Sequence, residues 1–101
     1  MEVITRTSTN FEAEVINSDL PVLVDFWAPW CGPCRVVLPL VEEIAAERQD
    51  LKVGKINVDE QKELARKFRV MSIPTLLVIQ NGEVVNRSTG EKDKEAILAM
   101  L

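Results

Sequence analysis

The chain contains no histidine, and only two of its 101 residues are cysteine. Structural zinc and iron–sulfur sites usually take four soft ligands from cysteine and histidine side chains. This shortage argues against both kinds of site, so we expect no bound metal. The sequence also lacks a Gly-x-Gly-x-x-Gly stretch and a phosphate-binding loop. We therefore expect no nucleotide and no other bound cofactor.

An excess of basic residues is missing as well. The chain has 12 Lys and Arg residues against 16 Asp and Glu residues, which gives a net charge of -4, and the basic residues never form a run. This pattern offers no electrostatic support for a nucleic-acid partner. The apolar runs are too short to cross a bilayer, so we expect no membrane partner either.

The first residues, Met1 to Arg6, lack the basic and apolar regions of a secretory signal peptide. We therefore expect a cytoplasmic protein, and in that reducing compartment a cysteine pair is more often catalytic than structural. The apolar fraction of 47% and the charged fraction of 28% are ordinary for a globular protein. We expect one domain over residues 1–101, working as a monomer.

Both cysteines lie in one stretch, Val22 to Arg35, which also holds both tryptophans. Its first part, Val22 to Trp27, is apolar and predicts a strand that is covered on both faces. A helix is predicted to open at Cys31 and Cys34, and the N-terminus of a helix favours the negative charge of a thiolate. Two thiols with this spacing at this place are typical of a dithiol redox site.

Two other interpretations of the cysteine pair remain open. A structural disulfide across so small a ring removes little entropy from the unfolded chain, worth about 2 kcal/mol. Its tight geometry also favours reduction. A pair of inert buried thiols is the commonest fate of cysteine, but it leaves the Gly32-Pro33 spacer and the neighbouring Trp30 unexplained.

Asp25 is the one charged residue in the apolar strand predicted at 22–27. A strand covered on both faces buries this carboxyl group, which is costly unless the group is paired or protonated. Buried acids with perturbed pKa values cluster at active sites, so we expect Asp25 to have a function. The alternative is an exposed kink near the end of the strand.

Hydrophobic periodicity and turn signals predict the element order β-α-β-α-β-α-β-β-α. The predicted strands are Val3–Ile4, 22–27, 51–58, 75–80 and 83–88, and the predicted helices run from Thr9 or Asn10 to about 17, then 34–48, 59–68 and 94–101. This order places parallel strands beside crossover helices and ends with an antiparallel hairpin turning at Asn81-Gly82.

Several motifs in a fixed order then carry a resemblance. Trp30-Cys31-Gly32-Pro33-Cys34 follows Val24-Asp25-Phe26-Trp27-Ala28, and further along come Lys55-Ile56-Asn57-Val58-Asp59, Ser72-Ile73-Pro74-Thr75, Asn81-Gly82 and Gly90. With these motifs the chain resembles the thioredoxin family over essentially its whole length. The resemblance implies the α/β thioredoxin fold, with a mixed five-stranded sheet flanked by four helices. It also implies a protein-disulfide oxidoreductase that works by dithiol–disulfide exchange.

The resemblance and the local chemistry agree on the roles of the two thiols. Cys31 lies at the turn and is expected to be the more exposed nucleophile, whereas Cys34 lies deeper and resolves the mixed disulfide. In thioredoxins the aspartate that matches Asp25 accepts the proton of the resolving thiol, often paired with a lysine that matches Lys55. An exposed strand lysine is the alternative for Lys55.

The resemblance further implies that the Ile73–Pro74 peptide bond is cis and packs against the dithiol, with the Ile73 backbone pairing with an extended client segment. A trans proline that opens a strand is the alternative. The implied substrate-binding surface comprises Trp30, Gly32, Pro33, Ile73, Pro74 and Gly90, whereas Trp27 is expected in the core beside it.

By resemblance, the protein is a general reductant of disulfides in client proteins and is recycled by a thioredoxin reductase. One rival is a more oxidising thiol oxidase or isomerase, and the Gly-Pro spacer argues against it because those relatives typically carry a histidine there. A second rival is a binding module with an incidental dithiol. Four residues depart from the usual pattern of the family and bear on partner choice and redox potential: Pro29, Arg35, Arg69 and Thr89.

Overall fold

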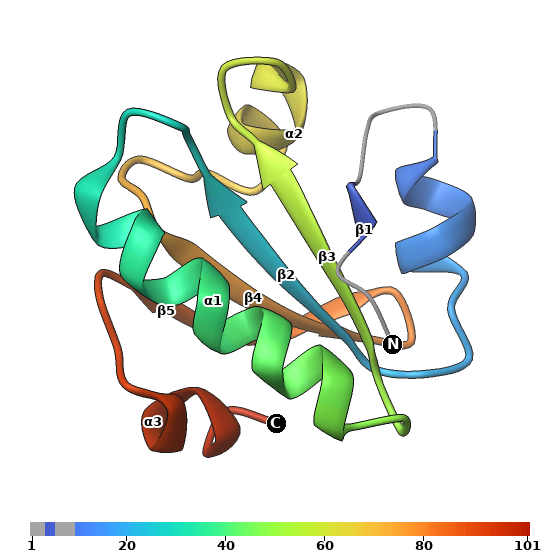
Figure 1. Ribbon diagram of the computed structural model, residues 1–101. Coiled ribbons are helices and arrows are strands. Elements are labelled where there is room, and N and C mark those ends of the chain that lie inside the picture. The colour runs from blue at the N-terminus through green and yellow to red at the C-terminus, as the bar shows by residue number, and fades with distance from the viewer. Residues whose placement is uncertain (1–3, 6–9) are drawn as a thin grey trace.

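The computed structural model describes residues 4–5 and 10–101. Within them, a mixed five-stranded sheet in the order β1-β3-β2-β4-β5 forms the centre of the molecule (Figure 1). Strand β3 runs parallel to β1 and β2, whereas β4 is antiparallel to β2 and β5. The strands are β1 Ile4–Thr5, β2 Val22–Trp27, β3 Lys52–Asn57, β4 Thr75–Gln80 and β5 Glu83–Thr89. Val3 and Thr9, at the predicted first strand and first helix cap, lie outside the described residues.

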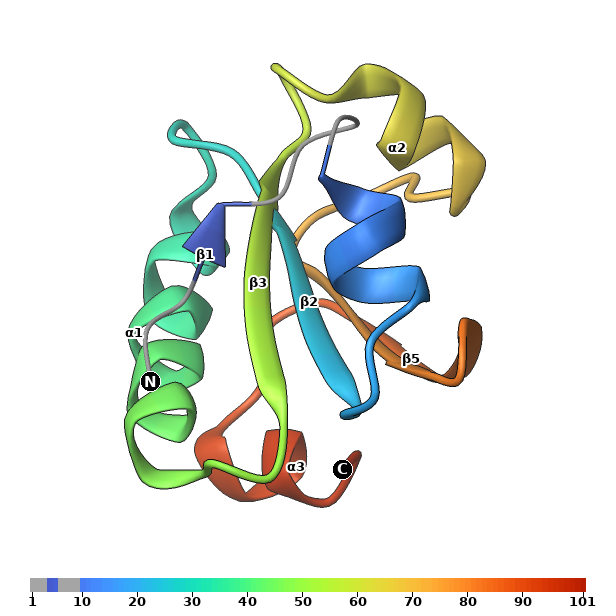
Figure 2. The same cartoon turned by 90° about the vertical axis from the view of Figure 1, so that its right-hand side faces the viewer.

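Helices cover both faces of this sheet. The helices are η1 Glu12–Ile16, α1 Gly32–Glu47, α2 Lys62–Lys67 and α3 Lys94–Leu98. Seen edge-on, the sheet has α1 on one side and η1 with α2 on the other, and α3 lies near the lower end of α1 (Figure 2). The described chain therefore has the α/β architecture of a mixed sheet between helices that the sequence predicts.

The core is divided between the two faces because successive side chains of a strand point to opposite sides. Leu23 packs in one buried cluster with Val37 and Val41 of α1. Its neighbours in β2 pack in the other cluster, in which Phe68 contacts both Phe11 and Phe26, at ring distances of 5.3 and 6.2 Å. Odd-numbered residues of β2 therefore face α1, while the even-numbered ones face η1 and α2.

Helix α1 begins at Gly32, two residues before the predicted start at Cys34. The sulfur of Cys31 explains the difference, because it accepts the backbone N–H of Cys34 and caps the helix. The first turn thus holds Pro33, whose missing N–H has no partner to lose at this position. The helix ends at Glu47, one residue before its predicted end.

Helix α2 is shorter than the predicted 59–68, since it begins at Lys62. Asn57 holds the preceding residues in turns: its side-chain oxygen accepts the N–H of Asp59, and its carbonyl accepts the N–H of Gln61. An Asn side chain that bonds the backbone two residues on favours a turn over a helix. The pattern of apolar residues could not reveal this competition.

The first and last helices also differ from the prediction. Segment η1 has the wider π-helical turn and holds five residues, and the Ser18 hydroxyl then forms a turn with the backbone of Leu20. Helix α3 ends at Leu98 instead of Leu101, because the last N–H groups bond to carbonyls three residues back. By contrast, β2 and β4 have the predicted bounds.

The hairpin between β4 and β5 turns at the predicted Asn81-Gly82 pair. Both residues have positive φ, 53° and 79°, as a two-residue hairpin turn requires. A Cβ atom placed on Gly82 would lie 3.3 Å from the Ile16 carbonyl oxygen and 3.4 Å from the Ile16 side chain. Glycine is therefore needed at this position both for its backbone angle and for space.

We expect Gly82→Ala to lower the free energy of unfolding by about 1–2 kcal/mol, because alanine is strained at positive φ and crowds Ile16. Urea unfolding of the oxidised protein measures this change. Gly32→Ala is the matched control, since apart from its chain neighbours and the backbone of its own helix no atom lies within 4 Å of a Cβ placed there. Equal stabilities of the two variants would contradict this account of the turn.

Candidate active site

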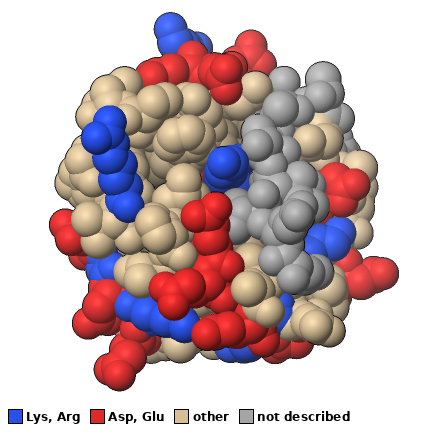
Figure 3. Space-filling model, viewed as in Figure 1, with Lys and Arg blue, Asp and Glu red and all other residues tan. Residues whose placement is uncertain are grey.

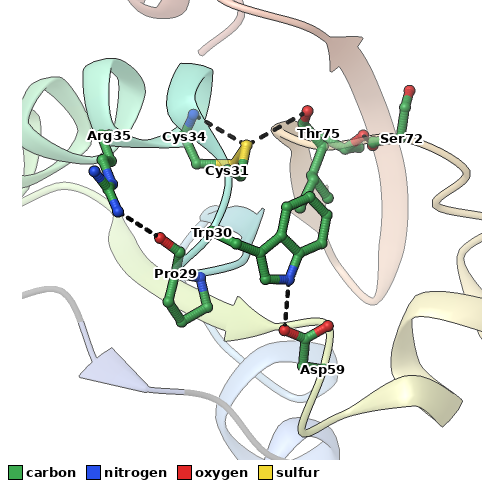
Figure 4. Close-up of a disulfide and its surroundings, with 9 residues drawn as sticks. Pro29, Trp30, Cys31, Cys34, Arg35, Asp59, Ser72 and Thr75 are labelled. Atoms are coloured by element: carbon green, nitrogen blue, oxygen red, sulfur yellow. Dashed lines mark hydrogen bonds between the residues drawn. A yellow bond between two sulfur atoms is a disulfide. The ribbon is translucent and has the colours of Figure 1, made fainter.

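Cys31 and Cys34 form a disulfide at the N-terminus of α1, with their Cα atoms 5.3 Å apart (Figure 4). The Cys31 sulfur accepts the Cys34 N–H at 3.2 Å, so the dipoles at the start of the helix point toward this sulfur. Cys31 is 4% exposed and Cys34 is 1% exposed. Cys31 is thus only slightly the more exposed of the two, because it packs beside Ile73, Trp27 and Ala28.

The segment before β4 packs against the dithiol through Ile73. The Ile73–Pro74 peptide bond is cis, and the Ile73 carbonyl oxygen lies 3.8 Å from the Cys31 sulfur. The Gly90 N–H donates to the Pro74 carbonyl at 2.8 Å. The end of β2, the start of β4 and the end of β5 therefore bring Cys31, Ile73–Pro74 and Gly90 to one edge of the sheet.

Trp30 stands on the surface beside the dithiol and is 68% exposed. Its indole N–H donates to a carboxylate oxygen of Asp59 at 2.8 Å (Figure 4). Asp59 follows β3, which runs parallel to β2, so both residues leave the sheet at the same edge. The hydrogen bond holds the indole beside the dithiol. The sequence alone did not predict this contact between Asp59 and Trp30.

Of the residues that depart from the family pattern, Pro29 and Arg35 lie together beside the site. The Arg35 guanidinium donates to the Pro29 carbonyl at 3.1 Å (Figure 4). Thr89 lies across from Thr75, with 3.4 Å between their hydroxyl oxygens. Arg69 has a φ of 54°, in the left-handed region that favours glycine.

Asp25 is fully buried in β2, and its odd number places it on the face toward α1. Among the described residues, neither of its carboxylate oxygens has a hydrogen-bond partner. Burial disfavours the charged form and raises the pKa of Asp25 from 3.8 to about 7, against the opposing effect of Lys55. The group can therefore take up or release a proton near neutral pH.

Lys55 lies directly across from Asp25 in the register of β2 and β3. Its ammonium group sits 5.3 Å from the ring centre of Trp27, and it forms no ion pair within 4.0 Å of Asp25. Lys55 therefore acts on Asp25 through its field across the strands, while the face of Trp27 holds the cation. Lys55 thus neighbours Asp25 across the strands, as a partnership with that residue requires, without a direct hydrogen bond to the carboxyl group.

A hollow of about 400 Å³ opens next to the dithiol, between Trp30 and Ile73. Val58, Val70 and Met71 also line it, and Met71 is 93% exposed. Sequence reasoning missed this hollow. The one available signal was a large apolar residue, Met71, in a segment that breaks every periodic pattern.

Within the described part of the chain, no three His, Cys, Asp or Glu side chains are placed to hold a metal ion. No helix in that part is both long and apolar enough to cross a membrane.

Comparisons with known proteins agree with the geometry of the dithiol. The family model described as Thioredoxin matches residues 2–101. A thioredoxin of Bacillus subtilis (strain 168) is 53% identical over 98 residues, which cover 96% of this chain and 92% of that protein. A thioredoxin of Mycobacterium tuberculosis (strain ATCC 25618 / H37Rv) is 52% identical over 96 residues, covering 94% of this chain and 83% of that protein.

The chain also matches one part of a longer protein. A protein of Mycobacterium leprae (strain TN), named bifunctional thioredoxin reductase/thioredoxin, is 53% identical over 93 residues. The match covers 91% of this chain and 20% of that protein.

We expect Asp25→Ala to remove a pH dependence of stability from the oxidised protein. The native state holds the Asp25 proton up to about pH 7, whereas the ordinary pKa is 3.8. The free energy of unfolding of the wild type therefore falls as pH rises through this window, by on the order of 4 kcal/mol in all. Above about pH 7, the variant should be the more stable protein, although the cavity that it leaves offsets part of the gain.

Urea unfolding between about pH 5 and pH 9 measures this difference. Asp19→Ala is the control, because Asp19 is an exposed aspartate and its removal should leave the pH profile of the wild type unchanged. If Asp25→Ala is the less stable protein throughout this range, the carboxyl group is not the destabilising buried acid described above.

Proposed function

The chain belongs to the thioredoxin family, and we propose that it reduces disulfides of client proteins with Cys31 as nucleophile and Cys34 as resolving thiol. Dithiol–disulfide exchange is its reaction, and it is a protein-disulfide oxidoreductase. The observation that carries the assignment of roles is the Cys31–Cys34 disulfide at the start of α1, with the Cys31 sulfur at the cap.

The reaction proceeds in two exchanges. The Cys31 thiolate attacks one sulfur of the client disulfide, which forms a mixed disulfide and releases the other client sulfur as a thiolate. Cys34 then loses its proton, and its thiolate attacks the Cys31 sulfur. This step releases the second client thiolate and leaves the Cys31–Cys34 disulfide, so two electrons pass from the protein to its client.

The first exchange is favoured at Cys31 because the Cys34 N–H already donates to its sulfur. Hydrogen bonds and helix dipoles that point at a sulfur stabilise its thiolate. Cys34 lies within the first turn of α1 and is slightly less exposed than Cys31. Its target in the second exchange is the neighbouring Cys31 sulfur, so it need not reach a client. This difference in position supports the two roles.

Asp25 is the proposed proton acceptor for Cys34. It lies on the face of β2 that α1 covers, and α1 carries Cys34 in its first turn. Burial brings the pKa of Asp25 to about 7, so its carboxylate can take a proton near neutral pH. Lys55 assists by favouring the carboxylate through its positive charge.

The proposed client surface surrounds the dithiol. The Ile73 carbonyl lies beside the Cys31 sulfur, where an extended client segment can pair with the backbone. The members of this surface come from the first turn of α1 and from three connections at one sheet edge: Trp30, Gly32, Pro33, Ile73, Pro74 and Gly90.

The electrons are proposed to come from a thioredoxin reductase. The Mycobacterium leprae relative unites a thioredoxin reductase and a thioredoxin by name, and this chain matches one fifth of its length. We further propose that the protein acts as a monomer in the cytoplasm. Thiols are kept reduced in that compartment, and a cysteine pair there is more often catalytic than structural.

An insulin-reduction assay with a supplied thioredoxin reductase tests the function. We expect the wild-type protein to catalyse insulin reduction and Cys31→Ser to lose this activity. A redox titration separates the reductant from a more oxidising isomerase of the same fold. Binding without reduction, retained in a Cys31→Ser/Cys34→Ser protein, would instead favour the binding module.

We expect Cys34→Ser to trap client proteins as mixed disulfides through Cys31. Without the resolving thiol, the intermediate cannot collapse to the Cys31–Cys34 disulfide. Pull-down followed by non-reducing electrophoresis should show adducts that a reductant releases. Cys31→Ser is the control, and if it traps clients while Cys34→Ser does not, the two roles are reversed.

A further inference from the structure

An apolar groove leads away from the dithiol toward α2. It consists of the hollow beside Trp30 and a second hollow of about 470 Å³. The two hollows share Val58, Val70 and Met71 in their walls, so they form one continuous groove. We call the whole the α2 groove, and it begins at the proposed client surface.

The outer half of the α2 groove is lined by basic side chains. Arg66, Arg69 and Lys62 line it together with Ala65 and the shared apolar residues. Three carboxylates lie at the start of α2, but they line a separate hollow that shares only Lys62 with the groove: Asp59, Glu60 and Glu63. The wall of the groove therefore combines apolar and positive groups.

Arg66 and Arg69 have no ion-pair partner among the described residues, in contrast to several other basic residues of this chain. Arg48 pairs with Asp50 at 2.7 Å, and Lys94 pairs with Glu47 at 2.7 Å. A positive group without an internal partner remains available to an external carboxylate. The guanidinium groups of Arg66 and Arg69 are both without such a partner among the described residues.

The backbone that carries Arg69 is held in place by another arginine. The Arg87 guanidinium on β5 donates to the carbonyl oxygens of Phe68 and Arg69. These bonds satisfy carbonyls at the end of α2, where Arg69 takes its left-handed φ of 54°. Arg87 therefore keeps the loop that forms one wall of the α2 groove in a defined conformation.

The positive groove belongs to a protein with a net charge of -4. On the face that Figure 3 shows, acidic side chains gather in the lower part with basic ones among them. Exposed Glu42, Glu43 and Glu47 come from α1. Lys94 pairs with Glu43 and Glu47, whereas Arg66 and Arg69 have no ion-pair partner among the described residues, so the unpaired positive charge lies at the α2 groove.

We propose that the α2 groove binds an extended client segment that carries acidic residues next to an apolar residue, beside the disulfide to be reduced. The apolar lining of the groove suits an apolar residue, and the two unpaired arginines suit acidic residues. Because the groove is continuous with the client surface, the bound segment belongs to the client. This inference rests on the proposed reductase function. It adds a preference among clients that the dithiol itself does not supply.

Three synthetic peptides test the proposal, each with one internal disulfide and the same apolar residue, but flanked by aspartate, asparagine or lysine. Stopped-flow fluorescence of the tryptophans measures the rate constant for reduction of each peptide by the reduced protein. We expect the aspartate peptide to react faster than the lysine peptide, by on the order of tenfold at low ionic strength. The ratio should approach one at high salt.

Variants locate the effect in the groove. Arg66→Gln/Arg69→Gly should bring the aspartate-to-lysine ratio close to one, and glycine suits the positive φ of residue 69. Arg66→Glu should favour the lysine peptide. Lys67→Gln is the matched control, because Lys67 is exposed on the same helix but does not line the groove, so the ratio of the wild type should remain.

Equal rate constants for the three peptides would overturn the proposal, as would an equal loss of the ratio in Lys67→Gln. If the charge preference is absent but insulin and the asparagine peptide are still reduced, the reductase function is supported and only the proposed preference is wrong. If neither is reduced, the function itself fails. Rate constants that fall as protein concentration rises would assign the groove to a second copy of the chain and overturn the client segment.

Discussion

Strand β2 is enclosed on all sides, and the reactive end of the molecule depends on this enclosure. It is hydrogen-bonded to β3 and β4, and its residues from Val22 to Phe26 are fully buried. A shift of its register by one residue would move every side chain of β2 to the other face of the sheet. Asp25 would then point away from α1. The packing of the core thereby sets both the position where Cys31 leaves the sheet and the direction of Asp25.

The burial that stabilises β2 also destabilises the carboxyl group of Asp25, which the proposed proton transfer uses. Apolar surroundings stabilise β2 through burial, yet they leave a carboxyl group without hydrogen-bond partners among the described residues. The rise of its pKa to about 7 follows from desolvation, and Lys55 moderates the rise. Because the Lys55 ammonium rests over Trp27 and not on the carboxylate, the acid keeps a proton affinity suited to exchange near neutral pH.

In the proposed function, the reaction and the selection of clients occupy different parts of one sheet edge. The dithiol and the cis Ile73–Pro74 bond lie at the end of β2 and the start of β4, and the α2 groove lies beyond Trp30. Exchange needs thiols held at a helix N-terminus, whereas selection needs only shape and charge next to them. A change in the groove, such as one at Arg69, therefore leaves the thiols that carry out the reaction in place.

The sequence by itself determined the element order, the bounds of β2 and β4, the hairpin turn at Asn81-Gly82 and the dithiol motif, because each depends on periodicity or on a few consecutive residues. Burial of Asp25 also followed, since the strand around it is continuously apolar. Only the tertiary structure decided the near-equal burial of the cysteines, the Trp30–Asp59 hydrogen bond, the place of Lys55 over Trp27 and the α2 groove. These features join residues that are distant in the chain, and their contacts exist only once strand order and helix packing bring the segments together.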